Sequence, residues 1–93
     1  MAKRKNITHI NNEYQLDRAK LKIVGSLIKV AREQSQISLD SLAESLCIDK
    51  QRLSALENAE ENNLPENVFI VGMIRRVAGH LRINADELIN ELN

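Results

Sequence analysis

The chain has 93 residues with thirteen basic and thirteen acidic side chains, one Phe, one Tyr and no Trp, so a single domain must build its core from Leu, Ile and Val. Its one cysteine, Cys47, excludes an internal disulfide, and the sequence contains no apolar run of membrane-spanning length and no signal-peptide pattern. We therefore expect a cytoplasmic protein. Runs of alternating β-branched residues are absent, which favours an all-α fold.

Charge is distributed unevenly along the chain. Residues 1–35 carry eight basic side chains against three acidic ones, whereas residues 36–70 carry two against seven. Residues 1–15 are polar, show no periodicity and begin with Lys3, Arg4 and Lys5, so we expect a flexible arm there and a folded domain over residues 16–93. The arm either grips phosphates or an acidic partner, or only keeps the chain in solution.

The first helical pattern extends from about Leu16 to near Ser35. One face is apolar, while Lys22, Lys29 and Arg32 lie off it. Gly25 either sits inside this helix or marks its beginning. The residues expected to be buried are Leu21, Val24, Leu27, Ile28 and Ala31.

Residues 38–58 predict two short helices joined by a tight corner, the outline of a helix-turn-helix motif, although an ordinary helical hairpin is the alternative. Ala43 is small enough to let the two helices approach, Ile48 fills the corner, and Asp49 caps the second helix. That second helix begins with polar side chains that nothing buries: Lys50, Gln51, Arg52 and Ser54.

Two further helices are predicted after a polar loop at residues 59–63. The first, about residues 65–81, begins near Pro65 and is so apolar that it is either central to the bundle or partly exposed for a partner. The second is opened by a capping box, with Asn84 as N-cap and Glu87 three residues later, and it continues to Leu92. The sequence thus predicts a five-helix all-α bundle.

No catalytic, metal or cofactor site is predicted. His9 and His80 are far apart, and no cysteine or carboxylate accompanies either one at the spacing of metal ligands. We interpret His80 as a residue at a helix end and Cys47 as a turn residue. The chain also contains no glycine-rich phosphate loop or nucleophile elbow, so we do not expect an enzyme.

Four segments of the sequence are distinctive: VAREQ in the first helix, the LAESLCI corner, LP followed by Val68, Phe69 and later Gly72, and the closing NADELI. Together they resemble the RodZ-type cytoplasmic domains within the phage-repressor-like (Xre) superfamily of helix-turn-helix proteins. The resemblance spans about residues 24–92. It implies a five-helix, non-enzymatic binding domain of repressor type.

Two partners follow from this resemblance. A repressor-like regulator would place Lys50, Gln51, Arg52 and Ser54 in the DNA major groove, with Lys3, Arg4 and Lys5 adding backbone contacts. Against this, Glu57, Glu60 and Glu61 are expected in the loop after the recognition helix, where they would repel phosphate. A homodimer formed through the apolar surplus of the helix at residues 65–81 would double the DNA contacts.

A RodZ-like adaptor would instead bind a protein, such as an actin-like filament of the MreB type. The resemblance places that docking surface on Phe69, Val71, Met73, Arg76 and Val77. Phe69 keeps the aromatic character of these positions, whereas Met73 and Val77 replace aromatics. We favour DNA binding, because the chain carries no membrane helix of the kind on which the adaptor arrangement depends.

Overall fold

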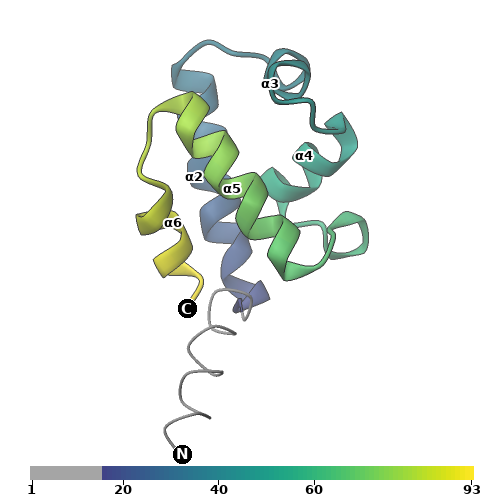
Figure 1. Ribbon diagram of the computed structural model, residues 1–93, viewed down its shortest axis with the longest axis vertical. Helices are drawn as coiled ribbons and strands as arrows, with labels where there is room; N and C mark the ends of the chain where they lie inside the picture. The colour runs from purple at the N-terminus through teal and green to yellow at the C-terminus, as the bar shows by residue number, and fades with distance from the viewer. Residues whose placement is uncertain (1–15) are drawn as a thin grey trace, which may run out of the picture.

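The computed structural model describes residues 16–93 as an all-helical bundle (Figure 1). The arm expected at residues 1–15 lies outside the described residues. Five α-helices and two 3-10 turns make up the described part: η1 (Arg18–Lys20), α2 (Leu21–Gln34), α3 (Leu39–Leu46), α4 (Lys50–Asn58), η2 (Glu61–Asn63), α5 (Asn67–Leu81) and α6 (Ala85–Glu91). The prediction of a five-helix all-α fold is confirmed.

Short polar side chains begin three of the helices. The backbone N–H of Ser41 donates to Ser38 Oγ at the start of α3 (3.0 Å), and that of Glu87 donates to Asn84 Oδ1 at the start of α6 (3.1 Å). At the start of α4 the Gln51 N–H donates to Asp49 Oδ1 (3.1 Å), so Asp49 is the N-cap, as predicted. Each such bond satisfies a backbone donor that has no partner within the helix.

Three helices end on a residue in the left-handed conformation, and none of the three residues is a glycine. Cys47 ends α3, Ala59 ends α4 and Arg82 ends α5, with φ angles of 54°, 54° and 60°. This conformation brings a side chain close to its own backbone, so only glycine adopts it without cost. Tertiary packing therefore fixes the ends of these helices, although the local preference of the three residues opposes the left-handed conformation.

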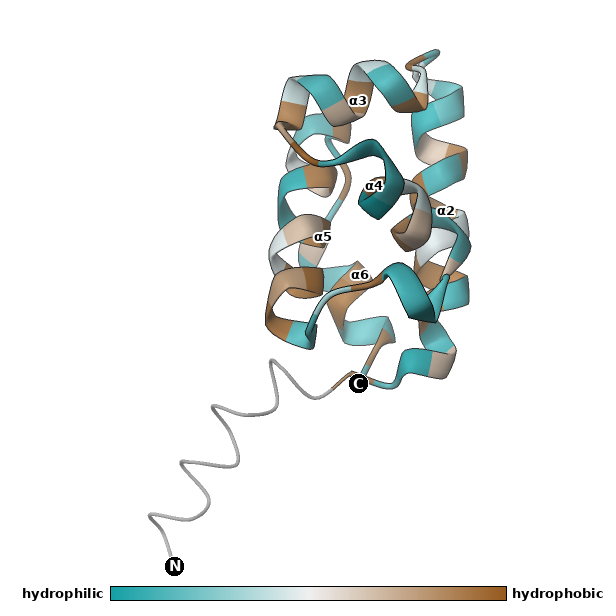
Figure 2. Ribbon diagram, turned by 90° about the vertical axis from the view of Figure 1, so that its right-hand side faces the viewer, coloured by the Kyte–Doolittle hydropathy of each residue, from teal (hydrophilic) through white to brown (hydrophobic). Residues whose placement is uncertain are grey.

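One core joins all five helices (Figure 2). In it α2 packs mainly against α4, and α5 mainly against α6. The fully buried large side chains come from α2 to α5 and from Leu92, the residue that follows α6: Leu21, Val24, Ile28, Leu42, Leu53, Leu56, Ile70, Ile74, Val77 and Leu92. No Phe, Tyr or Trp is among them, which agrees with the prediction that Leu, Ile and Val build the core.

Several boundaries and faces differ from the prediction. Gly25 lies inside α2, and α2 ends at Gln34 as expected, but regular helix begins only at Leu21. Pro65 precedes α5, which starts at Asn67. The prediction that Leu27 is buried is wrong, because α2 turns this side chain to the surface.

Candidate nucleic-acid interface

The corner between α3 and α4 has the helix-turn-helix geometry that the sequence predicts. Ala43 and Ile48 are both buried, and the Ile48 N–H donates to the Ala43 carbonyl oxygen (2.9 Å). Cys47 makes the turn through its left-handed backbone, and its side chain is exposed. The turn therefore fixes the direction in which α4 leaves the corner.

Close contact with α2 fixes the position of α4. A Cβ atom built on Gly25 would lie 2.4 Å from the Leu56 carbonyl oxygen and 2.5 Å from that of Glu57. Real Cβ atoms do not approach backbone so closely, so the two helices can pack this tightly only because residue 25 is a glycine.

A buried ion pair joins the same two helices. Arg32 Nε lies 2.7 Å from Glu57 Oε2, and Arg32 Nη2 donates to Glu57 Oε1 at 3.0 Å. Arg32 Nη1 also donates to the Ile37 carbonyl oxygen (2.9 Å), which ties down the chain leading into α3. The hydrogen bond to Glu57 raises the pKa of Arg32, so the guanidinium stays charged wherever the domain is folded.

This pair corrects two predictions from the sequence. Arg32 does not lie off the buried face of its helix, and Glu57 is not in the loop after α4. Glu57 is an internal residue of α4 whose charge is neutralised inside the molecule. It therefore does not repel DNA, which removes one of the three carboxylates that weighed against that partner.

The start of α4 presents the side chains predicted to contact DNA. Lys50, Gln51 and Arg52 are exposed, whereas Ser54 is half-buried and its Oγ accepts a hydrogen bond from Asn58 Nδ2 (3.3 Å). Lys50 Nζ pairs with Asp40 Oδ1 at 2.7 Å on the open surface. Arg52 has no hydrogen-bond or ion-pair partner among residues 16–93. Its guanidinium is thus available to a ligand.

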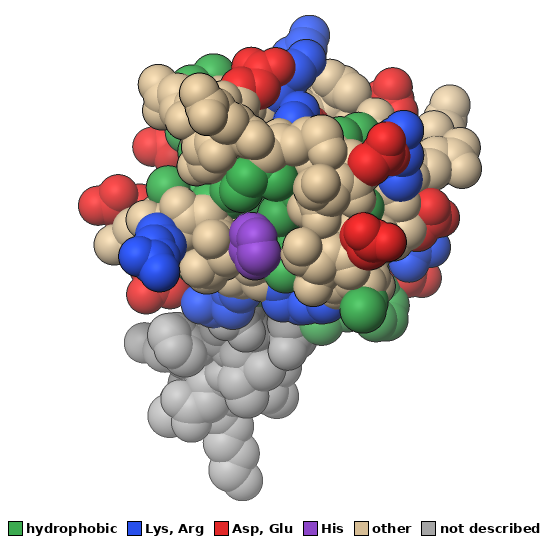
Figure 3. Space-filling view, turned by 90° about the horizontal axis from the view of Figure 1, so that it is seen from above, with side chains coloured by type: hydrophobic (Ala, Val, Ile, Leu, Met, Phe, Trp, Pro, Cys, Tyr) green, Lys and Arg blue, Asp and Glu red, His purple; other side chains and the backbone are tan. Residues whose placement is uncertain are grey.

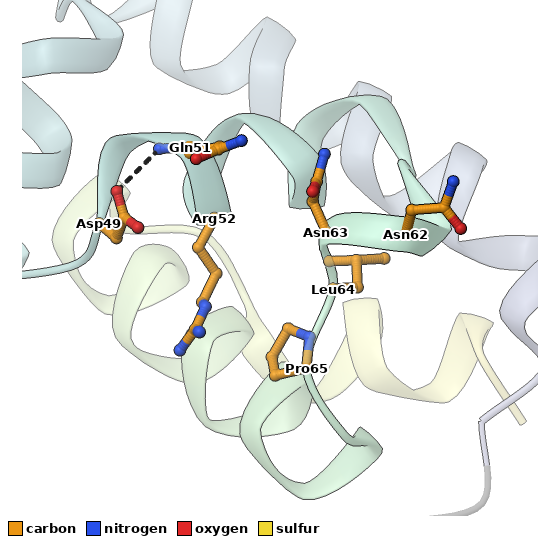
Figure 4. Close-up of a pocket in the computed structure, with 7 residues that line it drawn as sticks. All are labelled: Asp49, Gln51, Arg52, Asn62, Asn63, Leu64 and Pro65. Carbon is orange, nitrogen blue, oxygen red and sulfur yellow. Dashed lines mark hydrogen bonds between the residues drawn. The ribbon is translucent and has the colours of Figure 1, made fainter.

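Gln51 and Arg52 border a shallow concavity of about 310 Å³ between α4 and the chain that leads to α5 (Figure 4). Asn62 and Asn63 of η2 line it opposite α4, and Arg52 extends from α4 toward α5. The side chains of Gln51, Asn62 and Asn63 make no hydrogen bond to any of the described residues. Three free carboxamides and a free guanidinium are groups that recognise base edges.

Asn62 and Asn63 are not among the residues that the sequence predicts to contact DNA. They belong to the polar loop that follows the recognition helix, and this position was the signal that could have found them. Lys3, Arg4 and Lys5, the predicted arm contacts, lie outside the described residues.

Carboxylates remain near this surface, and the charge is mixed elsewhere as well. Glu60, which precedes η2, and Glu61, its first residue, are exposed, and Glu61 Oε2 lies 3.7 Å from Arg18 Nε. The end of the molecule seen in Figure 3 likewise intersperses acidic and basic side chains around His80, which is exposed in the last turn of α5 as predicted. DNA approaching α4 would meet few cations, so contacts to bases must supply much of the specificity.

The predicted docking surface on α5 is only partly accessible. Val71, Met73 and Val77 are buried in the core, which corrects their assignment to a surface and leaves Phe69 and Arg76 exposed. Arg76 Nη2 donates to the Leu46 carbonyl oxygen at the end of α3. The apolar surplus of α5 is therefore mostly core, and it supplies little of the dimer interface expected there.

A second concavity, of about 280 Å³, runs between the α3–α4 corner and α5. Phe69 is 58% exposed and its neighbour Val68 is 42% exposed. The lining is mixed in polarity and comprises Cys47, Ile48, Asp49, Arg52, Val68, Phe69, Gly72, Met73 and Arg76.

Among residues 16–93 no three His, Cys, Asp or Glu side chains gather as metal ligands would. No helix there is long and apolar enough to cross a membrane.

Comparison with known families agrees with the geometry of the corner. The model of the helix-turn-helix domain family matches residues 27–88, from the middle of α2 into α6. The chain belongs to this family. Its α3 and α4 are thus the two helices of a helix-turn-helix binding module. No solved structure matches the chain.

Proposed function

We propose that this helix-turn-helix domain binds double-stranded DNA and acts as a regulator of the Xre superfamily. The start of α4 enters the major groove, and the α4–η2 concavity faces base edges. Gln51, Asn62 and Asn63 supply amide groups that pair with adenine, and Arg52 supplies a fork that pairs with guanine.

The observation that carries this proposal is the state of Arg52. Six other cations of residues 16–93 have partners: Lys50 with Asp40, Arg32 with Glu57, Arg18 with Glu61, Arg75 with Asp86, Arg76 with the Leu46 carbonyl oxygen and Lys20 with the Asn93 carbonyl oxygen. Arg52 is exposed at the start of the recognition helix, has no partner among the described residues and stands beside three free amides. An unpaired arginine in this position recognises DNA without first breaking an ion pair.

The test is fluorescence anisotropy of the full chain on a pool of random-sequence duplexes, at several salt concentrations. We expect selection of a preferred sequence and an affinity that falls with salt. Arg52→Ala is expected to weaken binding about 10-fold to 100-fold, the loss of a bidentate base contact. Arg82→Ala removes the same charged group from the exposed residue that ends α5, which belongs to neither proposed contact surface, and serves as the matched control.

Failure would take one of two forms. If the wild type does not bind duplex DNA at low salt, the DNA-binding proposal is refuted. If Arg52→Ala and Arg82→Ala lose the same small amount of affinity, the protein acts only through its charge and the assigned surface is wrong.

A second candidate function rests on a different observation, the exposure of Phe69 and Val68 on α5. In this reading the domain is a RodZ-like adaptor that binds an actin-like filament of the MreB type. Burial of a large aromatic side chain against a partner is a common anchor of protein interfaces. The adjoining concavity, with Arg52 and Arg76 at its rim, would accept an apolar segment that carries acidic residues.

Co-sedimentation with such filaments tests this second function. Phe69→Glu is expected to abolish filament binding and leave the fold intact, because the side chain is exposed. Ile23→Glu, at an exposed apolar position of α2, is the control. Equal co-sedimentation of the wild type and both variants would remove Phe69 from any filament-binding surface.

A further inference from the structure

A stripe of exposed apolar residues runs along α2 on the side that the core does not use. Ile23, Leu27 and Val30 are 51%, 47% and 49% exposed. Their spacing of four and then three residues places them on one face of the helix, as in the seam of a coiled coil. Figure 2 shows α2 along one edge of the bundle, with no other element of residues 16–93 on its outer side.

We infer that this stripe is the contact surface for a second copy of the chain, with the two α2 helices antiparallel. A two-fold contact requires that the stripe be complementary to itself. When Leu27 lies opposite Leu27 of the second copy, Ile23 of each copy lies opposite Val30 of the other. All three apolar residues are then covered in a single register. This contact does not depend on whether the domain binds DNA.

The charges beside the stripe select the same arrangement. Lys22, Ser26, Lys29 and Glu33 line its polar flank, and antiparallel helices bring like flanks together. In the register set by Leu27, Glu33 of each copy stands next to Lys22 of the other, and Lys29 stands next to Ser26. A parallel pairing would place Lys22 level with Lys22 and Glu33 level with Glu33, so neither attraction would form.

The buried surface is small, which sets the strength of the association. The area buried by three apolar side chains per copy is less than the roughly 1,200 Å² of total area that a stable interface buries. We therefore expect a weak dimer, with a dissociation constant on the order of 100 μM.

Sedimentation equilibrium of the full chain, from about 10 μM to about 1 mM, measures this association. Leu27→Glu is expected to raise the dissociation constant at least about tenfold. Val68→Glu makes the same change at a similarly exposed position on α5 and should leave it unchanged. Circular dichroism verifies that both variants are folded.

A charge exchange tests the proposed ion pair. Glu33→Lys should weaken the dimer, and adding Lys22→Glu to the same chain should restore it. A wild type that stays monomeric at the highest concentration overturns the inference. So does a dimer that Val68→Glu disrupts and Leu27→Glu does not.

Disulfide cross-linking tests the register, with Cys47→Gly as the background because Cys47 is the only native cysteine. Leu27→Cys should cross-link to itself. Ile23→Cys and Val30→Cys should each fail to do so, but should cross-link when mixed. Efficient self-linkage at all three positions would indicate parallel helices and overturn the antiparallel pairing.

Discussion

The three glycines lie inside helices. Replacement by alanine is expected to stabilise the domain at two of these positions and to destabilise it at the third. Gly25 belongs to α2, and Gly72 and Gly79 belong to α5. Alanine in a helix interior is favoured over glycine by about 0.5–1 kcal/mol. This gain is available at Gly72 and Gly79, where a new Cβ would meet no atom within 4 Å. We expect Gly72→Ala and Gly79→Ala each to raise the free energy of unfolding by that amount.

At Gly25 the same methyl group meets backbone. A Cβ would lie 2.4 Å from the Leu56 carbonyl oxygen and 2.8 Å from the carbonyl carbon of Glu57. Backbone within a helix cannot rotate away as a side chain can, so α2 and α4 must separate by about 1 Å to restore normal contact. Overpacking of this kind costs about 1–3 kcal/mol. Separation also weakens the buried Arg32–Glu57 pair, and we therefore expect Gly25→Ala to lower stability by about 2–4 kcal/mol.

Thermal denaturation followed by circular dichroism measures all three variants against the wild type. In a domain of this size, 1 kcal/mol shifts Tm by about 4–8 °C, so the opposite signs are easily resolved. A Gly25→Ala variant as stable as the wild type would refute the close approach of α2 and α4. Destabilisation by Gly79→Ala equal to that by Gly25→Ala would refute the assignment of the effect to packing.

Three further variants test the core and the helix ends. Arg32→Ala leaves Glu57 buried without a partner and should cost about 3–5 kcal/mol, whereas replacing both residues with apolar side chains of similar volume should recover most of the loss in the same denaturation assay. Ala59→Gly relieves a left-handed residue at the end of α4 and should stabilise the domain by about 0.5–1 kcal/mol, seen as a higher Tm; a lower Tm would contradict that geometry. Val71→Glu places a charge in the core and should unfold the domain by circular dichroism, so a folded Val71→Glu variant would contradict the burial of this residue.

Local sequence rules predicted the helices well because helix signals are local. The caps at Asp49 and Asn84 and the small Ala43 opposite Ile48 all lie within a few residues of the feature that they determine. The start of α5 was misplaced by two residues, since Pro65 suits either the first turn or the approach to a helix.

Pairings between distant segments were not predictable in the same way. Arg32 and Glu57 are 25 residues apart, and each alone reads as a solvated charge. Their burial follows from how α2 and α4 meet, which no local pattern specifies. Leu27 was misassigned for a related reason: α2 carries two adjacent apolar faces, and periodicity alone does not say which one the core covers.

The same ambiguity affected α5 in the opposite sense. Its apolar residues suggested an exposed partner surface, but a helix packed on several sides buries Val71, Met73 and Val77 and exposes only Val68 and Phe69. The exposure of Lys50, Gln51 and Arg52 at the start of α4 was predicted correctly. The polar residues at the start of the recognition helix are exposed because their sequence spacing from the apolar residues places them on the opposite face. The contribution of Asn62 and Asn63 depends instead on how η2 folds back beside α4.

The two proposals are thermodynamically linked if both hold. Each phosphate contact lowers the logarithm of the affinity by about 0.9 per tenfold increase in salt. The start of α4 makes few such contacts, because Lys50 is paired with Asp40 and Arg52 is the cation that remains free there. One domain then binds DNA weakly and reads it mainly through Gln51, Arg52 and nearby amides. Pairing through α2 would double these contacts on any DNA that both copies reach together, so DNA would favour the dimer and the dimer would favour DNA by the same factor. Leu27→Glu would then weaken DNA binding without touching the DNA surface, and the loss should disappear when a single domain is measured on a duplex too short for two.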